Sequence, residues 1–232
     1  VPLEGAGSRA TIATNNPVNS CSSNSLTGET VCTGNVNDVY LITGSSLNTT
    51  LVAGSDGTLQ NFSGGSCQTC GVAVNSGNNT AVITVGIAGA GGFQFLDLAT
   101  STFAPPIPAG ILTSDNVSVD PARHFVLSPS EQGTYQILDT LTSGLFNNVV
   151  NPVGGEFDSA AEDCSTGIAL STIEFTNGLY LADLTQATFT PGAPGSWSAP
   201  SQVQSFPEFA GLSAGTSGIA VAPGSHLAIV TG

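Results

Sequence analysis

Apolar residues occur along this chain in short runs that are separated by Gly, Ser, Asn and Pro. Residues 80–85 (TAVITV) and 124–128 (HFVLS) are two such runs, and both are rich in β-branched or aromatic residues. Between them lie turn-forming stretches such as residues 75–79 (NSGNN). Short runs with this composition favour strands over helices. The pattern therefore predicts an all-β protein built from many short strands and tight turns.

Four short segments are similar to one another and recur along the chain. They begin at residues 71, 116, 167 and 218 and read GVAVN, NVSVD, GIALS and GIAVA. A second motif, with an aspartate at Asp97, Asp139 or Asp183, follows each of the first three segments. A period of about 40 to 50 residues that holds several short strands is typical of β-propeller blades. We expect a β-propeller of four-stranded blades, about four to five of them, with the repeated segments as innermost strands.

The repeats also predict how the chain is divided. Residues 1–35 are expected to form an extended segment, and residues 36–232 the blades, of which the last is incomplete because residues 218–231 supply only two strands. An uncovered edge strand promotes aggregation, so this edge must be covered. Residues 38–43, 49–53 and 58–62 would close a ring of about four blades if they paired there. If they do not pair there, missing sequence or a partner chain would complete the ring. An open β-sandwich in place of a propeller is the remaining alternative.

The Gly-(Val/Ile)-Ala-(Val/Leu) segments and the Leu-Asp-Leu motif resemble those of secreted bacterial β-propellers of the lactonase-like and surface-protein kind. This resemblance spans residues 36–232 and concerns the fold. Residues 162–170 (EDCSTGIAL) and 217–224 (SGIAVAPG) are similar to longer uncharacterised secreted propellers. The lactonase-like resemblance implies a catalytic calcium held by Glu, Asn and Asp at the channel mouth, and Glu162, Asp163 and Asn116 are residues of these types.

Charge and composition narrow the possible partners and the compartment. The chain has 16 acidic residues against 2 arginines and a net charge of -14. The positive surface that binds phosphates is missing, which argues against nucleic acid and anionic membranes as partners. No apolar run approaches the roughly 18 residues of a membrane span, so we expect no membrane insertion. The lack of lysine and methionine and an N-terminus that reads as a processed mature end predict a secreted or cell-surface protein.

The five cysteines are an odd number, so at least one of them has no partner within the chain. Cys21 and Cys32 flank a polar segment that cannot pack by itself, and we expect them to form a disulfide. Cys67 and Cys70 have redox-motif spacing, but a strand is expected after them rather than the helix that lowers a thiol pKa. These two cysteines therefore predict a local structural disulfide. Cys164 is then the unpaired or intermolecular thiol.

Four carboxylates fall close together in an expected loop that leads into an inner strand: Glu156, Asp158, Glu162 and Asp163. Carboxylates at this spacing repel one another, so the loop either faces water or binds a hard cation. Calcium is the cation that such oxygen ligands suit. Both interpretations remain open from the sequence. No spacing indicates a nucleophile, base and acid in one site.

Four Asn-x-Ser/Thr sites fit the N-glycosylation pattern, namely Asn48, Asn61, Asn78 and Asn116. The sequence predicts a non-catalytic extracellular scaffold that binds a protein or glycan partner, or that associates with itself through the edge strand near Thr231. One alternative is a calcium-dependent hydrolase of the lactonase-like type acting at the channel mouth. The other is a subunit of an extracellular filament or surface layer.

Overall fold

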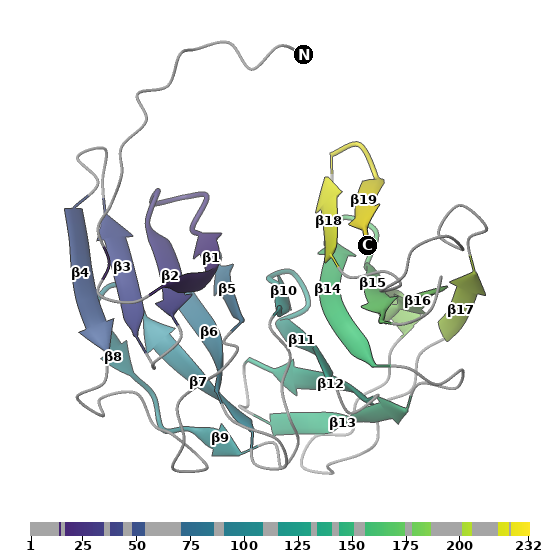
Figure 1. Cartoon of the computed structure of the whole chain (residues 1–232), viewed down its shortest axis with the longest axis horizontal. Helices are drawn as coiled ribbons and strands as arrows, with labels where there is room; N and C mark the ends of the chain where they lie inside the picture. Colours follow the sequence, from purple (N-terminus) through teal and green to yellow (C-terminus); the bar gives the residue numbers. More distant parts are fainter. Residues whose placement is uncertain are drawn as a thin grey trace.

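Antiparallel β-sheets make up nearly all of the computed structural model (Figure 1). The structure describes the following residues: 14, 17–34, 38–43, 48–53, 71–85, 91–108, 116–130, 134–140, 144–150, 156–174, 178–186, 201–205, 218–222 and 224–232. Within these residues there are five sheets and one 3-10 helix, η1 (Leu184–Gln186). The expected all-β class is thereby confirmed.

In each sheet the strands lie side by side in the order of the sequence. The first sheet contains β1 (Val18–Ser23), β2 (Thr30–Gly34), β3 (Val39–Thr43) and β4 (Asn48–Ala53). The second contains β5 (Val72–Asn75), β6 (Thr80–Val85), β7 (Gly92–Asp97) and β8 (Thr102–Phe103), and β9 (Ile107–Pro108) also pairs with β7.

The third sheet contains β10 (Ser118–Asp120), β11 (Phe125–Ser130), β12 (Thr134–Asp139) and β13 (Gly144–Val150). The fourth contains β14 (Phe157–Asp163), β15 (Ile168–Ile173), β16 (Gly178–Asp183) and β17 (Ser201–Ser205). The fifth contains two described strands, β18 (Gly218–Ala222) and β19 (Leu227–Thr231).

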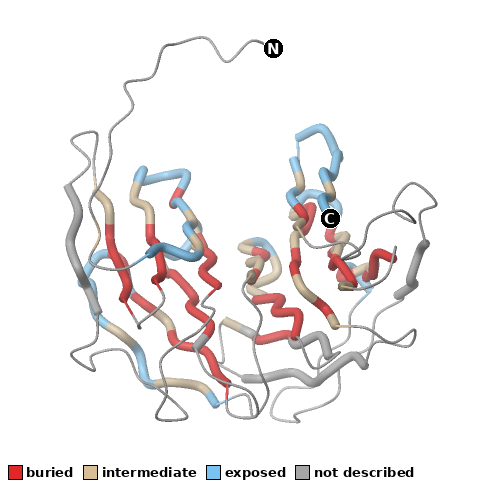
Figure 2. The backbone as a smooth tube through the Cα atoms, in the orientation of Figure 1, coloured by how far each residue is buried: buried red, intermediate tan, exposed pale blue. Residues whose placement is uncertain are grey.

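The five sheets follow one another along a curve, and the first strand of each sheet lies on its concave side (Figure 1). Consecutive sheets contact each other mainly through these first strands. Buried residues concentrate in the strands of the first four sheets, whereas the turns and most of the fifth sheet are exposed (Figure 2). The curve fits the stacking expected of blades, and its concave side holds the turns described below.

Side chains that alternate along the strands fill the space between sheets, as the pleat requires. In the second sheet Ala81, Ile83 and Leu96 face the first sheet, whereas Val82 and Phe93 face the third. The third and fourth sheets share a core of the following residues: Leu127, Ile137, Phe157, Ala160, Ala169, Ile173, Tyr180, Ala182 and Leu184. Inner sheets are thus apolar on both faces, and this explains their continuous apolar sequences.

The repeated segments take two different positions in the sheets. Those at residues 71, 116 and 218 lead into β5, β10 and β18, the first strands of their sheets, as expected. The segment at residue 167 instead becomes β15, a second strand. The first strand of the fourth sheet is β14, which is the stretch that we expected to be an acidic loop. Its buried Phe157 and Ala160 pack into the core and make it a strand despite its carboxylates.

The N-terminal strands correct the expected boundary after residue 35. β1 and β2 precede that point, and β2 pairs with β3 beyond it, so the four strands β1 to β4 form a single sheet. β3 pairs with β2 and β4 within the first sheet, so β3 and β4 do not complete the fifth sheet. Residues 58–62, which were expected to pair there too, lie outside the described residues.

Turns between the first and second strands share one plan, in which an Asx side chain accepts a backbone N–H two residues later. Asn24, Asn75, Asp120 and Asp163 each do so with an Oδ1 atom. Near the end of each turn the backbone turns left-handed, with positive φ at these residues: Gly28, Asn79, His124, Gly167 and His226. Asp97 builds a similar turn after β7, with Ser101 at φ 55°. The repeated aspartate at position 97 is therefore a turn residue.

The predicted disulfide between Cys21 and Cys32 is confirmed, and it joins directly opposed residues of β1 and β2. The two cysteines are 11 residues apart. Closing a loop of this length in the unfolded chain contributes about 3 kcal/mol to the free energy of unfolding. We expect a Cys21→Ala, Cys32→Ala variant to lose about this much in urea denaturation. Ser20→Ala in the same strand is the control, and a loss below about 1 kcal/mol would contradict the expectation.

Candidate functional site

The turns on the concave side contact one another from sheet to sheet. Between the first and second sheets, Asn24 Nδ2 donates to Asn79 Oδ1 at 2.6 Å. Ser25 and Ser76 are joined by a hydrogen bond between their hydroxyl groups at 3.2 Å. Between the third and fourth sheets, Arg123 Nη1 donates to the Cys164 carbonyl at 3.1 Å. Polar turn residues thus join consecutive sheets.

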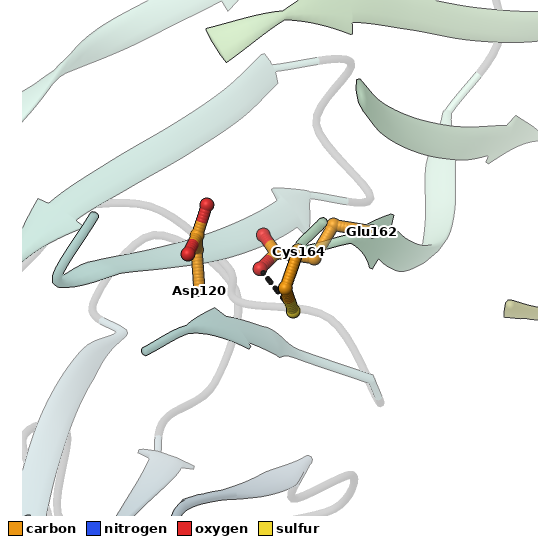
Figure 3. Close-up of side chains that lie close together, drawn as sticks. All are labelled: Asp120, Glu162 and Cys164. Carbon is orange, nitrogen blue, oxygen red and sulfur yellow. Dashed lines mark hydrogen bonds between the residues drawn. The ribbon is translucent and has the colours of Figure 1, made fainter. Parts of the chain in front are cut away.

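The third and fourth sheets meet at a cluster of Asp120, Glu162 and Cys164 (Figure 3). One ligand atom from each residue lies within 4.8 Å of the others. Asp120 ends β10 and is fully buried, and its Oδ2 atom forms an ion pair with Arg123 Nη1 at 2.7 Å. The Cys164 thiol donates to Glu162 Oε1 at 3.2 Å. Glu162 Oε2 is buried and has no hydrogen-bond partner among the described residues.

Burial sets the protonation of this cluster. It raises the pKa of Glu162 to about 8, and the nearby Asp120 carboxylate contributes to the rise. Burial and the Glu162 carboxyl together raise the pKa of the Cys164 thiol to about 12. At neutral pH, therefore, Glu162 is largely protonated and Cys164 is a thiol. A free thiol of this kind is a poor nucleophile, because the thiolate is the reactive form.

The donor set is also a poor match for calcium. Calcium takes only oxygen ligands, whereas one of the three groups here is a sulfur. The Asp120 carboxylate already forms an ion pair with Arg123. A protonated Glu162 beside a paired Asp120 needs no cation to balance its charge. The cluster therefore has the character of a buried polar contact between two sheets.

The four residues predicted to bind calcium are distributed along one strand. Glu156 precedes β14, and Asp158, Glu162 and Asp163 lie within it. Adjacent residues of a strand point to opposite faces, so Glu162 and Asp163 have different neighbours. Of the four, only Glu162 belongs to the group of close ligand atoms found among the described residues. Calcium binding by these four residues stays a prediction.

Asp163 contacts Ser165 and His226, a combination of residue types that is also found in hydrolytic triads. Ser165 Oγ donates to Asp163 Oδ1 at 2.5 Å, and His226 Nδ1 lies 2.6 Å from Asp163 Oδ2. These two contacts hold the pKa of Asp163 well below its usual range. Ser165 Oγ lies 3.5 Å from the same ring nitrogen, Nδ1. A triad requires the serine at one ring nitrogen and the carboxylate at the other, so this geometry does not form one.

The contacts of Asp163 instead join two neighbouring sheets. His226 belongs to the turn between β18 and β19, and Asp163 ends β14. The pair therefore attaches the fifth sheet to the fourth in the same way that Arg123 attaches the fourth to the third.

The remaining predicted site residues lie in several places. Asn78 is exposed in the turn after β5, and Asn48 begins β4. The amide of Asn116 donates to Ser159 Oγ at 2.7 Å. Asn61 and the expected Cys67–Cys70 disulfide lie outside the described residues.

Sequence reasoning missed the role of Asp120, Arg123, Ser165 and His226. A usable signal was present, because the turns share a five-residue segment that begins with an Asx residue and ends with Gly, Asn or His. The segments in question are NSLTG, NSGNN, DPARH and DCSTG at residues 24–28, 75–79, 120–124 and 163–167. Aligning them would have placed these residues on one side of the sheets. In the fifth turn, APGSH at 222–226, alanine replaces the Asx residue.

Comparisons with known proteins inform the fold alone. No protein-family model and no curated protein matches the chain. A chain in the crystal structure of a nidogen/laminin complex, a structure that contains a β-propeller, is similar with a TM-score of 0.53 and 8% sequence identity. The match covers 71% of this chain and 59% of that chain, so this chain spans less than two thirds of its length. This likeness indicates a propeller-like fold and carries no information on a lactonase-like family.

Among the described residues, no helix is long and apolar enough to span a membrane.

Proposed function

We propose that this chain is a non-catalytic extracellular scaffold of the β-propeller type, which associates with a second copy of itself through its fifth sheet. The observation that carries the proposal is an apolar sheet face that remains exposed. Ile229 and Leu227 in β19 are 71% and 65% exposed. Large apolar side chains gathered on one exposed surface are typical of interaction sites.

The two faces of the fifth sheet differ in what covers them. Ile219 is 9% exposed, and Val221, on the same face of β18, lines a pocket together with Ile168 and Leu170 of the fourth sheet. Ile229 pairs with Ala220 on the opposite face, and both are exposed. In the second sheet the apolar side chains of both faces are buried, for example Val82 and Ile83. The fifth sheet thus has the composition of an inner sheet with one face uncovered.

The edge of the fifth sheet supports the same proposal. In the described part of the chain β19 pairs with β18 alone, so its other edge offers backbone groups for a further strand. A partner strand added there would extend the sheet by β-augmentation. Association through both the edge and the exposed face would bury apolar side chains and satisfy the backbone hydrogen-bonding groups of β19.

Two further observations agree with a non-catalytic extracellular role. Asp163, Ser165 and His226 serve to connect sheets, and Glu162 and Cys164 are largely uncharged at neutral pH. The Cys21–Cys32 disulfide suits an oxidising compartment.

Sedimentation velocity across a range of protein concentrations tests the association. We expect Ile229→Glu to weaken it by about tenfold or more, because it removes a buried side chain and places a charge in the interface. Leu26→Glu is the matched control, since Leu26 is 76% exposed in a turn of the first sheet. A wild-type chain that stays monomeric at high micromolar concentration, or variants that behave alike, would refute the proposal. Growth into long polymers would favour the filament or surface-layer alternative.

A further inference from the structure

A cavity of about 380 Å³ lies between the second and third sheets. This volume falls within the range of small-molecule binding sites. Asn75, Asn78 and Thr102 are among its lining residues and supply amide or hydroxyl groups. Asn78 and Thr102 are exposed, so the cavity can be reached from solvent near the turns after β5 and β7. Its described lining includes none of the residues of the Asp120–Glu162–Cys164 cluster or of the fifth sheet.

Asn75 lines this cavity and carries an unused hydrogen-bond donor. The residue is 4% exposed, and its Oδ1 atom accepts the Gly77 N–H at 2.9 Å. That bond identifies the other amide atom as Nδ2. Nδ2 is buried and has no hydrogen-bond partner among the described residues. A buried donor without a partner costs free energy, and a ligand oxygen in the cavity would remove that cost.

The charge of the lining restricts the class of ligand. Asp97 is the charged residue among the described residues of the lining, which include no Lys, Arg or His. A carboxylate without a cation disfavours phosphates and other anions. The Oδ1 atom of Asp97 already accepts the N–H groups of Ala99 and Thr100, at 2.8 and 3.1 Å. The remaining lining groups are neutral hydrogen-bonding or apolar ones.

Aromatic surface completes the lining. Phe95 and Phe103 are both lining residues and are half-buried. Phe95 packs on the side of the third sheet, whereas Phe103 lies opposite Leu96 and packs toward the first sheet. The C–H groups of a sugar ring pack on aromatic rings, while its hydroxyls hydrogen-bond to amides and carboxylates. Neutral amides and hydroxyls beside aromatic rings are the groups that a polyhydroxylated ligand requires.

We propose that this cavity binds a neutral carbohydrate, with Asn75 Nδ2 donating to a sugar oxygen and Phe95 packing against the ring. The inference deepens the proposed binding role and rests on it, but it concerns a different part of the molecule from the fifth sheet.

Saturation-transfer NMR on the full chain tests the proposal. The probes are free glucose, galactose, mannose and N-acetylglucosamine at millimolar concentration, with glucuronic acid and glucosamine as the acidic and basic counterparts. We expect at least one neutral sugar to receive saturation and glucuronic acid to receive much less. No transfer to any neutral sugar, or transfer to a charged sugar alone, would overturn the proposal.

Variants locate the binding. Asn75→Asp keeps the oxygen that accepts the Gly77 N–H and removes the Nδ2 donor, and Asp120 and Asp163 show that aspartate builds the same turn. We expect it to weaken sugar binding by about tenfold or more. Asn116→Asp is the matched control, because it makes the same exchange outside the cavity. Equal binding by wild type and Asn75→Asp would overturn the proposal.

A second variant keeps the test decisive if Asn75→Asp does not fold. Phe95→Leu removes the aromatic ring at a half-buried position of the lining, and we expect severalfold weaker binding by a chain that remains folded. Unchanged binding would count against the site. The Ile229→Glu variant should retain sugar binding, so failure of self-association and failure of the sugar site are seen separately.

Discussion

A Glu162→Gln substitution is expected to remove a large pH dependence from the stability of this protein. In the unfolded chain Glu162 has the ordinary glutamate pKa of 4.5, whereas in the fold the pKa is about 8. Between these values the native state holds a proton that the unfolded state has lost, so the free energy of unfolding falls as pH rises. The shift corresponds to at most about 5 kcal/mol. Glutamine stays neutral and carries no such dependence.

Urea denaturation at several pH values between about 5 and 8.5 measures this effect. We expect the variant and wild type to be similarly stable at the acidic end and the variant to be more stable by several kcal/mol at the alkaline end. Glu29→Gln is the control, because it removes one carboxylate from an exposed turn without touching the cluster. Parallel curves for wild type and Glu162→Gln would show that Glu162 is not protonated by burial.

Truncation of Phe157 is the second change with a large expected effect. This side chain is fully buried between the third and fourth sheets, and its ring packs edge-on against Tyr180 with 5.3 Å between centroids. We expect Phe157→Ala to lower the free energy of unfolding by about 3 to 5 kcal/mol, through lost burial and the cavity left behind.

Chemical denaturation of Phe157→Ala beside Leu26→Ala checks this expectation. Leu26 is 76% exposed, so its truncation should change the stability by no more than about 0.5 kcal/mol. A loss below about 1 kcal/mol for Phe157→Ala would mean that the third and fourth sheets do not depend on this contact.

The sequence predicts the repeated strands where apolar residues dominate, as in β5 and β18. It fails at β14, because Asp158, Glu162 and Asp163 conceal the strand that Phe157 and Ala160 anchor. Packing against the third sheet overrides the local polar signal there, and a single sequence does not display packing partners. For the same reason we expected the segment at residue 167 to be the first strand of its sheet, whereas it is the second.

The candidate site was harder to predict than the strands. Asp120 and Glu162 belong to different sheets, and they meet because the third and fourth sheets stack. No local sequence motif predicts a contact between residues of different sheets. The contrast between Glu162 and Asp163 follows from strand geometry, since neighbouring side chains of a strand point apart. Treating this stretch as a loop hid that contrast and made four carboxylates look like one cluster.

The turn contacts also bear on how such a chain can change in length during evolution. Asn24 with Asn79, Arg123 with Cys164 and Asp163 with His226 each link one sheet to the next in sequence order. Stability in such an array is approximately a sum over units and their nearest neighbours. A gene duplication or deletion that adds or removes one whole sheet with its turn would therefore disturb only the two units beside it. Selection can alter the number of sheets without redesigning the rest of the molecule.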